Sequence, residues 1–181
     1  MWNPLPSLPA DLDQWLWINI QTQTLQEMSG TRCLVSYPVS TAKAGLGEKS
    51  GSGQTPRGWH RVRARIGEGL PTGAILRGRR WEGECWDGAS TPDGRDPILA
   101  RILWLSGLEP GKNRGGVTDT FRRYIYIHGT ADLSGLGLPV SAGCIRMSPG
   151  DVIALFNRTP CGIPVFIGLE HPRHVWPQRR E

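Results

Sequence analysis

A histidine and a cysteine lie 16 residues apart in the segment IHGTADLSGLGLPVSAGCIRM, residues 127–147. A cysteine attacks as its thiolate, and a nearby imidazole can take the proton from the thiol. His128 and Cys144 therefore form a candidate base and nucleophile for acyl transfer. The alternative interpretation is a buried structural cysteine near a histidine that ends a strand.

The residues around Cys144 supply further groups that acyl transfer requires. Glycine allows a tight turn, so the amides of Gly143 and Cys144 can point at one carbonyl oxygen and form an oxyanion hole. Arg146 can bind a substrate carboxylate, or it can form an ordinary surface ion pair. A helix that begins near Ser148 adds a favourable dipole if its N-terminus faces the thiol.

A strand and a helix are predicted to flank this segment. RRYIYIHG, residues 122–129, alternates so that Tyr124, Tyr126 and His128 share one face of a strand that ends at a glycine. SPGDVIALFNRT, residues 148–159, starts with a capping serine, a proline at the first helical position and an acidic residue in the first turn, which predicts the one clear helix.

The remaining apolar runs predict short strands. Residues 15–20 and 33–39 read as a hairpin that turns at 29–30, 62–66 as a half-exposed strand, 98–111 as a strand in preference to a helix, and 162–169 as a last buried strand. Residues 42–58 and 80–97 are predicted to be irregular. Within them, 45–54 and 82–97 are candidate substrate-covering loops, with surface decoration as the equal alternative. The tail after Glu170 is expected to be frayed.

Composition limits the class of protein. The 181 residues are 38% hydrophobic, enough for one domain, and the 24 glycines and 15 prolines favour turns between short strands. The predicted fold is mainly β with one main helix, an α+β class. The net charge of +5 suits anionic partners, but no stretch alternates basic and aromatic residues, so nucleic-acid binding is not expected.

Targeting and metal-binding signals are not found. Residues 1–14 lack the basic and apolar regions of a signal peptide, and no window approaches the roughly 18 apolar residues of a membrane span, so a cytoplasmic address is expected, or a periplasmic one if a leader was removed. Cys33, Cys85, Cys144 and Cys161 are expected to be free thiols. HPRH at 171–174 has no second ligand pair nearby, so neither a metal nor another cofactor is expected.

The order of these motifs resembles the L,D-transpeptidase catalytic domain, the YkuD family, whose signature runs His-Gly, a loop, then Ser-His-Gly-Cys-x-Arg. Here it reads HGT at 128–130 and SAGCIRM at 141–147. YPVSTAKAGLG at 37–47, TPRG at 55–58 and CGIPVFI at 161–167 resemble further landmarks of the family, in order. The likeness spans residues 15–169, between an N-terminal extension, 1–14, and a basic C-terminal tail, 170–181.

The resemblance implies a β-sandwich-like catalytic fold that acts on peptidoglycan stem peptides. In the family, the cysteine attacks the amide between a diamino acid and the terminal D-Ala, D-Ala leaves, and the thioester passes to an amine or to water. The implied roles are nucleophile for Cys144, base for His128, carbonyl orienter for Gly129, oxyanion amides for Gly143 and Cys144, and support or substrate binding for Ser141, Arg146 and Tyr126.

One position departs from the signature, because Ala142 replaces the histidine that usually precedes the glycine. His128 is then the only candidate base in the motif, and steps that a second imidazole assists, such as acceptor binding, lose that group. With a cytoplasmic address, the expected output is L,D-carboxypeptidase trimming of soluble muropeptides from tetrapeptide to tripeptide. Cross-linking or D-amino acid exchange by an L,D-transpeptidase, a catalytically silent peptidoglycan-binding domain and a cysteine endopeptidase of another family are the alternatives. A carbapenem is expected to acylate Cys144, whose thiolate is expected to be more reactive than the other three cysteines.

Overall fold

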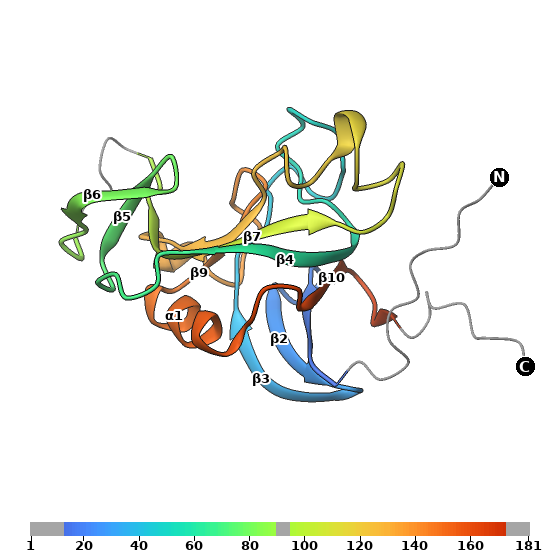
Figure 1. Cartoon of the computed structure of the whole chain (residues 1–181), viewed down its shortest axis with the longest axis horizontal. Coiled ribbons are helices and arrows are strands. Elements are labelled where there is room, and N and C mark those ends of the chain that lie inside the picture. Colours follow the sequence, from blue (N-terminus) through green and yellow to red (C-terminus); the bar gives the residue numbers. More distant parts are fainter. Residues whose placement is uncertain (1–12, 90–94, 173–181) are drawn as a thin grey trace, which may run out of the picture.

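The structure is a computed structural model that describes residues 13–89 and 95–172. Within those residues the chain forms ten strands, one α helix and two short 3-10 helices (Figure 1). Their bounds are β1 (Trp15–Asn19), β2 (Thr24–Ser29), β3 (Arg32–Pro38), β4 (Gly58–Ile66), β5 (Ala74–Arg77), β6 (Arg80–Cys85), β7 (Ile98–Gly107), η2 (Gly116–Thr118), β8 (Tyr126–Gly129), η3 (Leu133–Gly135), β9 (Ile145–Met147), α1 (Pro149–Arg158) and β10 (Pro164–Gly168). The predicted class, mainly β with one main helix, is confirmed.

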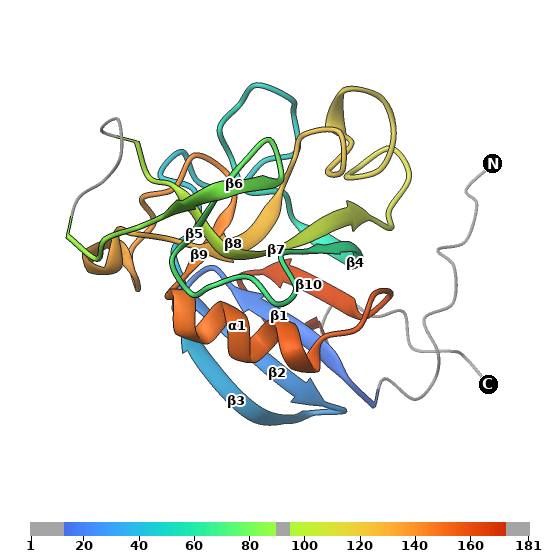
Figure 2. The same cartoon turned by 60° about the vertical axis from the view of Figure 1, so that its left-hand side comes forward.

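The strands form one strongly curled sheet in the order β3-β2-β1-β10-β4-β7-β5-β6. β8 leaves this order, because it pairs with β7 on one side and with β9 on the other. The β1–β10 and β8–β9 pairs are parallel, and the other pairs are antiparallel. Figure 2 shows α1 lying between β1–β3 and the strands around β7.

The core lies where α1 meets the sheet. The helix buries Val152, Leu155 and Phe156, which recur at helical spacing, in one cluster with Leu16 of β1 and Leu103 of β7. The helix packs on both β7 and β8. This packing holds β8, the strand that carries His128, in a fixed position.

The structure corrects three predictions about the strands. Residues 15–38 form three strands instead of one hairpin of two, because the buried residues of β2, Leu25 and Met28, are three positions apart and show no alternation. β5 was not predicted, and β6 lies in the stretch predicted to be irregular. All side chains of β6 are exposed, so backbone pairing with β5 forms this edge strand without an apolar pattern.

The two ends of the chain lie mostly outside the described residues, which leave out 1–12 and 173–181 and with them His174. The frayed tail predicted after Glu170 is wrong for His171, whose ring lies edge-on to Trp15 and Trp17 at 5.4 and 5.1 Å between ring centroids. In the described part of the chain, no helix is long and apolar enough to cross a membrane.

The predicted helix start is confirmed, and it yields a stability test. Ser148 Oγ accepts a hydrogen bond from the Asp151 N–H at 3.1 Å. Replacing Ser148 by alanine leaves that amide unsatisfied, and we expect the free energy of unfolding to fall by about 1 kcal/mol. Urea denaturation measures this change. Ser148→Asp is the matched control, because a carboxylate caps the same amide; an equal loss in both variants would contradict the capping role.

Candidate active site

Two neighbouring parallel strands bring the predicted residues together. β8 and β9 pair in register, with Ile127 opposite Ile145 and His128 opposite Arg146. His128 therefore lies within β8, while Cys144 directly precedes β9 on the adjacent strand. His128 and Cys144 are 16 residues apart in sequence, but the connection between β8 and β9 returns the chain so that the two residues lie on adjacent parallel strands.

His128 is held as one tautomer. Its side chain is buried, and Nδ1 lies 2.8 Å from the Gly129 carbonyl oxygen. Because a carbonyl only accepts, Nδ1 carries the hydrogen and Nε2 keeps the lone pair that a base needs. Burial lowers the pKa of His128 below its usual 6.5, so the imidazole is neutral near neutral pH.

Gly129 is required at this position for a packing reason as well. A Cβ on Gly129 would lie 2.6 Å from the carbonyl oxygen of Leu99 on the paired strand β7. Only a residue without a side chain therefore allows β8 to pair here without a shift. The carbonyl of Gly129 that holds His128 depends on that pairing.

The Cys144 thiol is half-buried and hydrogen-bonded. Sγ donates to the Tyr124 carbonyl at 3.3 Å and accepts from the Tyr126 N–H at 3.4 Å. Burial raises the pKa of the thiol above its usual 9.0, against smaller lowering by the Tyr126 amide and by the charges of Arg146 and Arg123. The thiol is protonated at rest, so its proton must leave as the sulfur attacks.

The turn before the thiol is built from its own hydrogen bonds. Ser141 Oγ donates to the Cys144 carbonyl at 2.6 Å and accepts from the Gly143 N–H at 3.2 Å. Thr55 Oγ1 donates to the Gly143 carbonyl at 2.9 Å. The supporting role predicted for Ser141 agrees with this geometry. The oxyanion role predicted for Gly143 does not, because its amide is directed at Ser141 inside the turn.

Arg146 is braced by two carboxylates. Its guanidinium lies 2.9 Å from Asp96 and 3.9 Å from Asp132, and 17% of its side chain is exposed. Asp96 also accepts from the Thr130 hydroxyl at 2.6 Å, which ties the segment after β8 to the same cluster. This arrangement favours the bracing alternative over binding of a substrate carboxylate. Sequence reasoning missed Asp96, because it lies in a stretch without a recognisable pattern.

Aromatic rings and one arginine flank the thiol. The Tyr126 hydroxyl accepts from Arg79 Nη1 at 3.2 Å, and the Arg79 guanidinium lies 5.0 Å from the Trp104 ring and 5.2 Å from the Tyr124 ring. The prediction that Tyr124 lies on the strand face with Tyr126 is wrong. Tyr124 precedes β8 with φ 56°, and this turn directs its carbonyl to the thiol.

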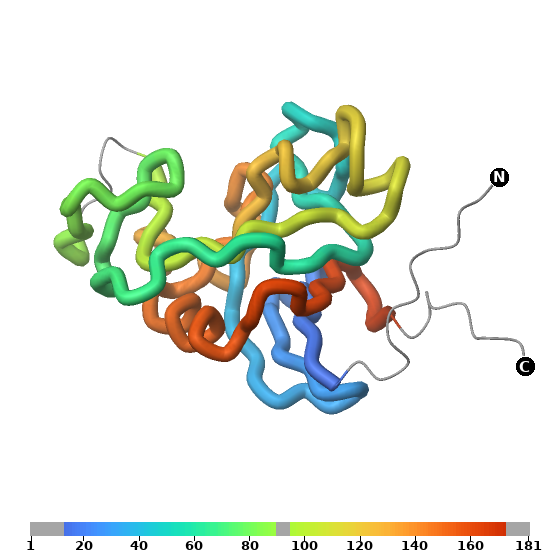
Figure 3. The backbone as a smooth tube through the Cα atoms, in the orientation of Figure 1, coloured from blue at the N-terminus to red at the C-terminus, as the bar shows by residue number. Residues whose placement is uncertain are grey.

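A cation that sequence reasoning missed holds the glycine-rich loop beside the thiol. Arg123 donates from its two Nη atoms to the carbonyls of Gly47, Glu48 and Gln54 and to the Ser52 hydroxyl, at 2.5 to 3.5 Å. The loop also touches the segment around η2, since the Ser50 N–H donates to the Val117 carbonyl at 2.7 Å. Figure 3 shows the two segments side by side. The predicted covering loop 45–54 therefore lies next to the site.

Removing Arg123 tests both of its contributions. Arg123→Met loses the bonds to the loop, and we expect a loss of about 2 kcal/mol in the free energy of unfolding. It also removes a positive charge that lowers the Cys144 pKa, so the pKa should rise further. Iodoacetamide alkylation of Cys144 across a pH series measures this shift. Arg61→Met on β4 is the control, and an unchanged alkylation profile in Arg123→Met would contradict the electrostatic role.

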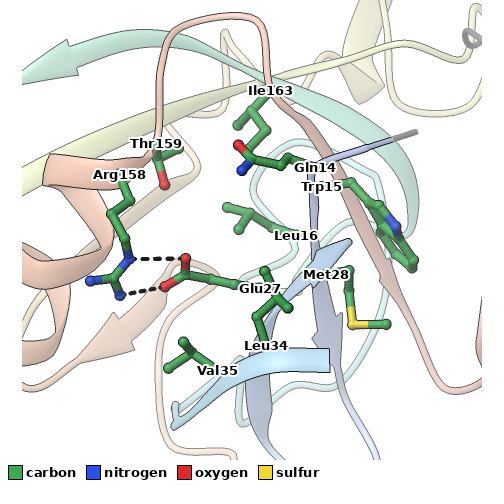
Figure 4. Close-up of a pocket in the computed structure, with 10 residues that line it drawn as sticks. All are labelled: Gln14, Trp15, Leu16, Glu27, Met28, Leu34, Val35, Arg158, Thr159 and Ile163. Carbon is green, nitrogen blue, oxygen red and sulfur yellow. Dashed lines mark hydrogen bonds and ion pairs between the residues drawn. The ribbon is translucent and has the colours of Figure 1, made fainter. Parts of the chain in front are cut away.

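Two of the cavities in the described structure can be placed relative to the predicted site residues. One, of about 310 Å³, lies between β1–β3 and the end of α1, around the ion pair of Arg158 with Glu27 (Figure 4). It contains none of the predicted site residues. The other, of about 340 Å³, is lined by Ala142 and by Tyr124, whose carbonyl accepts a hydrogen bond from the Cys144 thiol. Among residues 13–89 and 95–172, no group of three or more metal-binding side chains is arranged to hold an ion.

Together these features describe a β protein whose candidate site has the parts for cysteine-dependent acyl transfer. The sequence model of the L,D-transpeptidase catalytic domain, YkuD, matches residues 13–167. The chain belongs to this family, and the predicted resemblance to it is confirmed.

Comparison with individual relatives agrees with this assignment. The chain is 28% identical over 164 residues to the probable L,D-transpeptidase ErfK/SrfK of Salmonella typhimurium, a match that covers 88% of this chain and 46% of that protein. The chain thus spans about half the length of this curated relative.

Solved structures share the fold. L,D-transpeptidase 3 from Mycobacterium tuberculosis superposes with a TM-score of 0.53 at 17% identity, over 86% of this chain and 61% of that chain. LdtMt1 in complex with imipenem gives 0.52 at 17% identity, over 86% and 59% of the two chains. At this identity the likeness establishes the fold alone.

Proposed function

We propose that this chain is an L,D-carboxypeptidase that removes the terminal D-Ala from peptidoglycan tetrapeptides. The observation that supports the proposal is the parallel pairing of β8 with β9, since His128 lies on β8 with its Nδ1 committed to the Gly129 carbonyl and Cys144 directly precedes β9. The family assignment supports peptidoglycan stem peptides as the substrate class.

The proposed reaction has two steps. Cys144 sulfur attacks the carbonyl carbon of the diamino acid while His128 Nε2 takes the thiol proton, and the same proton passes to the leaving amine of D-Ala. A water molecule then attacks the thioester, gives its proton to His128, and releases the tripeptide carboxylate. The thiol regains its proton, so Cys144 and His128 are restored.

Water is the proposed acceptor because of position 142. The methyl group of Ala142 offers no hydrogen bond and no basic nitrogen to hold an amine acceptor, whereas the family signature has an imidazole there. We propose a cytoplasmic address and soluble muropeptides as partners, with carbapenems as inhibitors; the imipenem complex of LdtMt1 supports the inhibitor class. Cell fractionation tests the address, and recovery of the protein from the periplasm alone would contradict it.

Mass spectrometry of a disaccharide tetrapeptide incubated with the protein in heavy-oxygen water tests the function. The expected products are free D-Ala and a tripeptide with one heavy oxygen in its new carboxylate. Tetrapeptide in which an added D-amino acid replaces D-Ala, or cross-linked dimer, would establish transfer instead. Cleavage within the stem would indicate an endopeptidase, and binding without any product would indicate a silent binding domain.

A further inference from the structure

The proposed reaction assigns no function to the 340 Å³ cavity near Cys144. It is lined by Ser50, Gly51, Gly53, Arg122, Arg123, Tyr124, Ile125 and Ala142. The carbonyl of Tyr124 accepts a hydrogen bond from the Cys144 thiol, and Ala142 lies two residues before Cys144, so the cavity shares lining residues with the surroundings of the thiol. Its volume of about 340 Å³ lies at the lower end of the range of ligand-binding pockets and leaves room for the terminal residue of a substrate.

The cavity has a positive wall. Within the described ranges, neither Arg122 nor Arg123 forms an ion pair with a carboxylate. Arg123 is bonded only to neutral oxygens of the loop, and Arg122 is exposed. Asp119 is the acidic group that influences Arg122, but its two oxygens accept the backbone N–H groups of Gly115 and Arg122. The Arg122 guanidinium therefore retains capacity to bind an anion, whereas the Nη groups of Arg123 are donated to the loop and Arg123 contributes its positive charge.

Other cations near the thiol are engaged elsewhere. Arg146 is paired with Asp96 and Asp132, and Arg79 lies on aromatic rings and donates to the Tyr126 hydroxyl. The positive charges that remain for a substrate carboxylate near Cys144 are therefore those of Arg122 and Arg123, which line the same cavity as Ala142. The small side chain of Ala142 also keeps this side open.

We propose that the cavity binds the free carboxylate of the leaving D-amino acid, with Arg122 as its direct partner and Arg123 as the fixed positive charge behind it. This inference rests on the proposed function and explains how the enzyme would select the terminal residue of the stem peptide. A guanidinium binds a carboxylate through two parallel hydrogen bonds, and only a terminal residue carries a carboxylate one residue beyond the scissile bond. Arg122 would then restrict the enzyme to the end of the stem peptide.

Binding of the tetrapeptide and of its C-terminal amide tests the proposal without requiring turnover. Both ligands are titrated into the Cys144→Ala chain and followed by NMR at the amides of Gly51, Gly53 and Ala142. The amide ligand lacks the terminal charge, so we expect it to bind about tenfold more weakly. Arg122→Gln should remove this difference, Arg122→Lys should keep part of it, and Arg61→Gln should leave it intact.

Several outcomes decide the matter. Equal affinity for the acid and the amide, no binding of the acid, or a preference that survives Arg122→Gln would overturn the carboxylate site. Ala142→Leu, which fills the cavity from its other wall, should weaken binding of the acid in the same assay. If the acid is preferred over the amide but the parent chain never releases D-Ala, the carboxylate site stands and the hydrolytic function is rejected. Failure of the carboxylate site is therefore distinguishable from failure of the proposed function.

Discussion

Cys144→Ala is expected to abolish both the release of D-Ala and covalent labelling by imipenem. The thiol is the proposed nucleophile, and the hydroxyl of Ser141 in the same turn is engaged with the Cys144 carbonyl and the Gly143 N–H. Loss of a nucleophile removes most of the catalytic effect, so the rate of D-Ala release should fall by at least about a thousandfold. Release is measured by chromatography of free D-Ala, and labelling by intact-protein mass spectrometry.

Cys161→Ala is the matched control for this prediction. Cys161 is an exposed free thiol, and none of the four cysteines forms a disulfide. The control should release D-Ala and accept imipenem at the rate of the parent chain. Circular dichroism of both variants establishes that each is folded. Undiminished D-Ala release by Cys144→Ala would reject the nucleophile.

His128→Gln is expected to lower kcat/KM for the tetrapeptide by about a hundredfold to ten-thousandfold. Glutamine keeps a polar side chain of similar size but supplies no base. His171→Gln serves as the control, since His171 lies against Trp15 and Trp17 of β1, which β10, β4 and β7 separate from β8 in the sheet. A folded His128→Gln variant with full activity would mean that another group takes the proton.

The pH dependence of the parent chain distinguishes how the thiol is activated. The base is neutral above its pKa, which burial places below 6.5, so kcat/KM should reach its plateau below that pH. The thiol pKa lies above 9.0, so a mechanism that starts from free thiolate would instead give activity rising into the alkaline range. We expect a plateau across neutral pH, and a continuous rise up to pH 9.0 would contradict proton transfer to His128.

The sequence predicted the parts of the site that depend on local pattern. One segment of the sequence contains His128, Gly129, Ser141 and Cys144 in the order of the family signature. The serine that caps α1 is likewise a local signal. Residues that reach the site across long sequence separations carried no such signal. Arg123 bonds to Gly47, 76 positions away, and its role follows from where two loops meet.

The sequence analysis missed some strands for a related reason. β6 has only exposed side chains, so its pairing partner determines it. Asp96 was placed in the same patternless stretch, yet its contacts with Arg146 and Thr130 connect β7 to the segments after β8 and around β9. Gly143 was correctly placed but given the wrong hydrogen bond, because turn geometry is not specified by residue type alone.

The position of β10 bears on how the domain is synthesised. β10 is the last strand of the domain, yet it lies between β1 and β4, joining the first strand in parallel and the fourth in antiparallel fashion. A chain emerging from the ribosome can form the β1–β3 meander and the β4–β7 pair, but these two sets of strands are not joined by strand pairing until residues 164–168 appear. Cys144 and His128 have by then already been synthesised, so the sheet is completed only after both residues of the candidate site are in the chain.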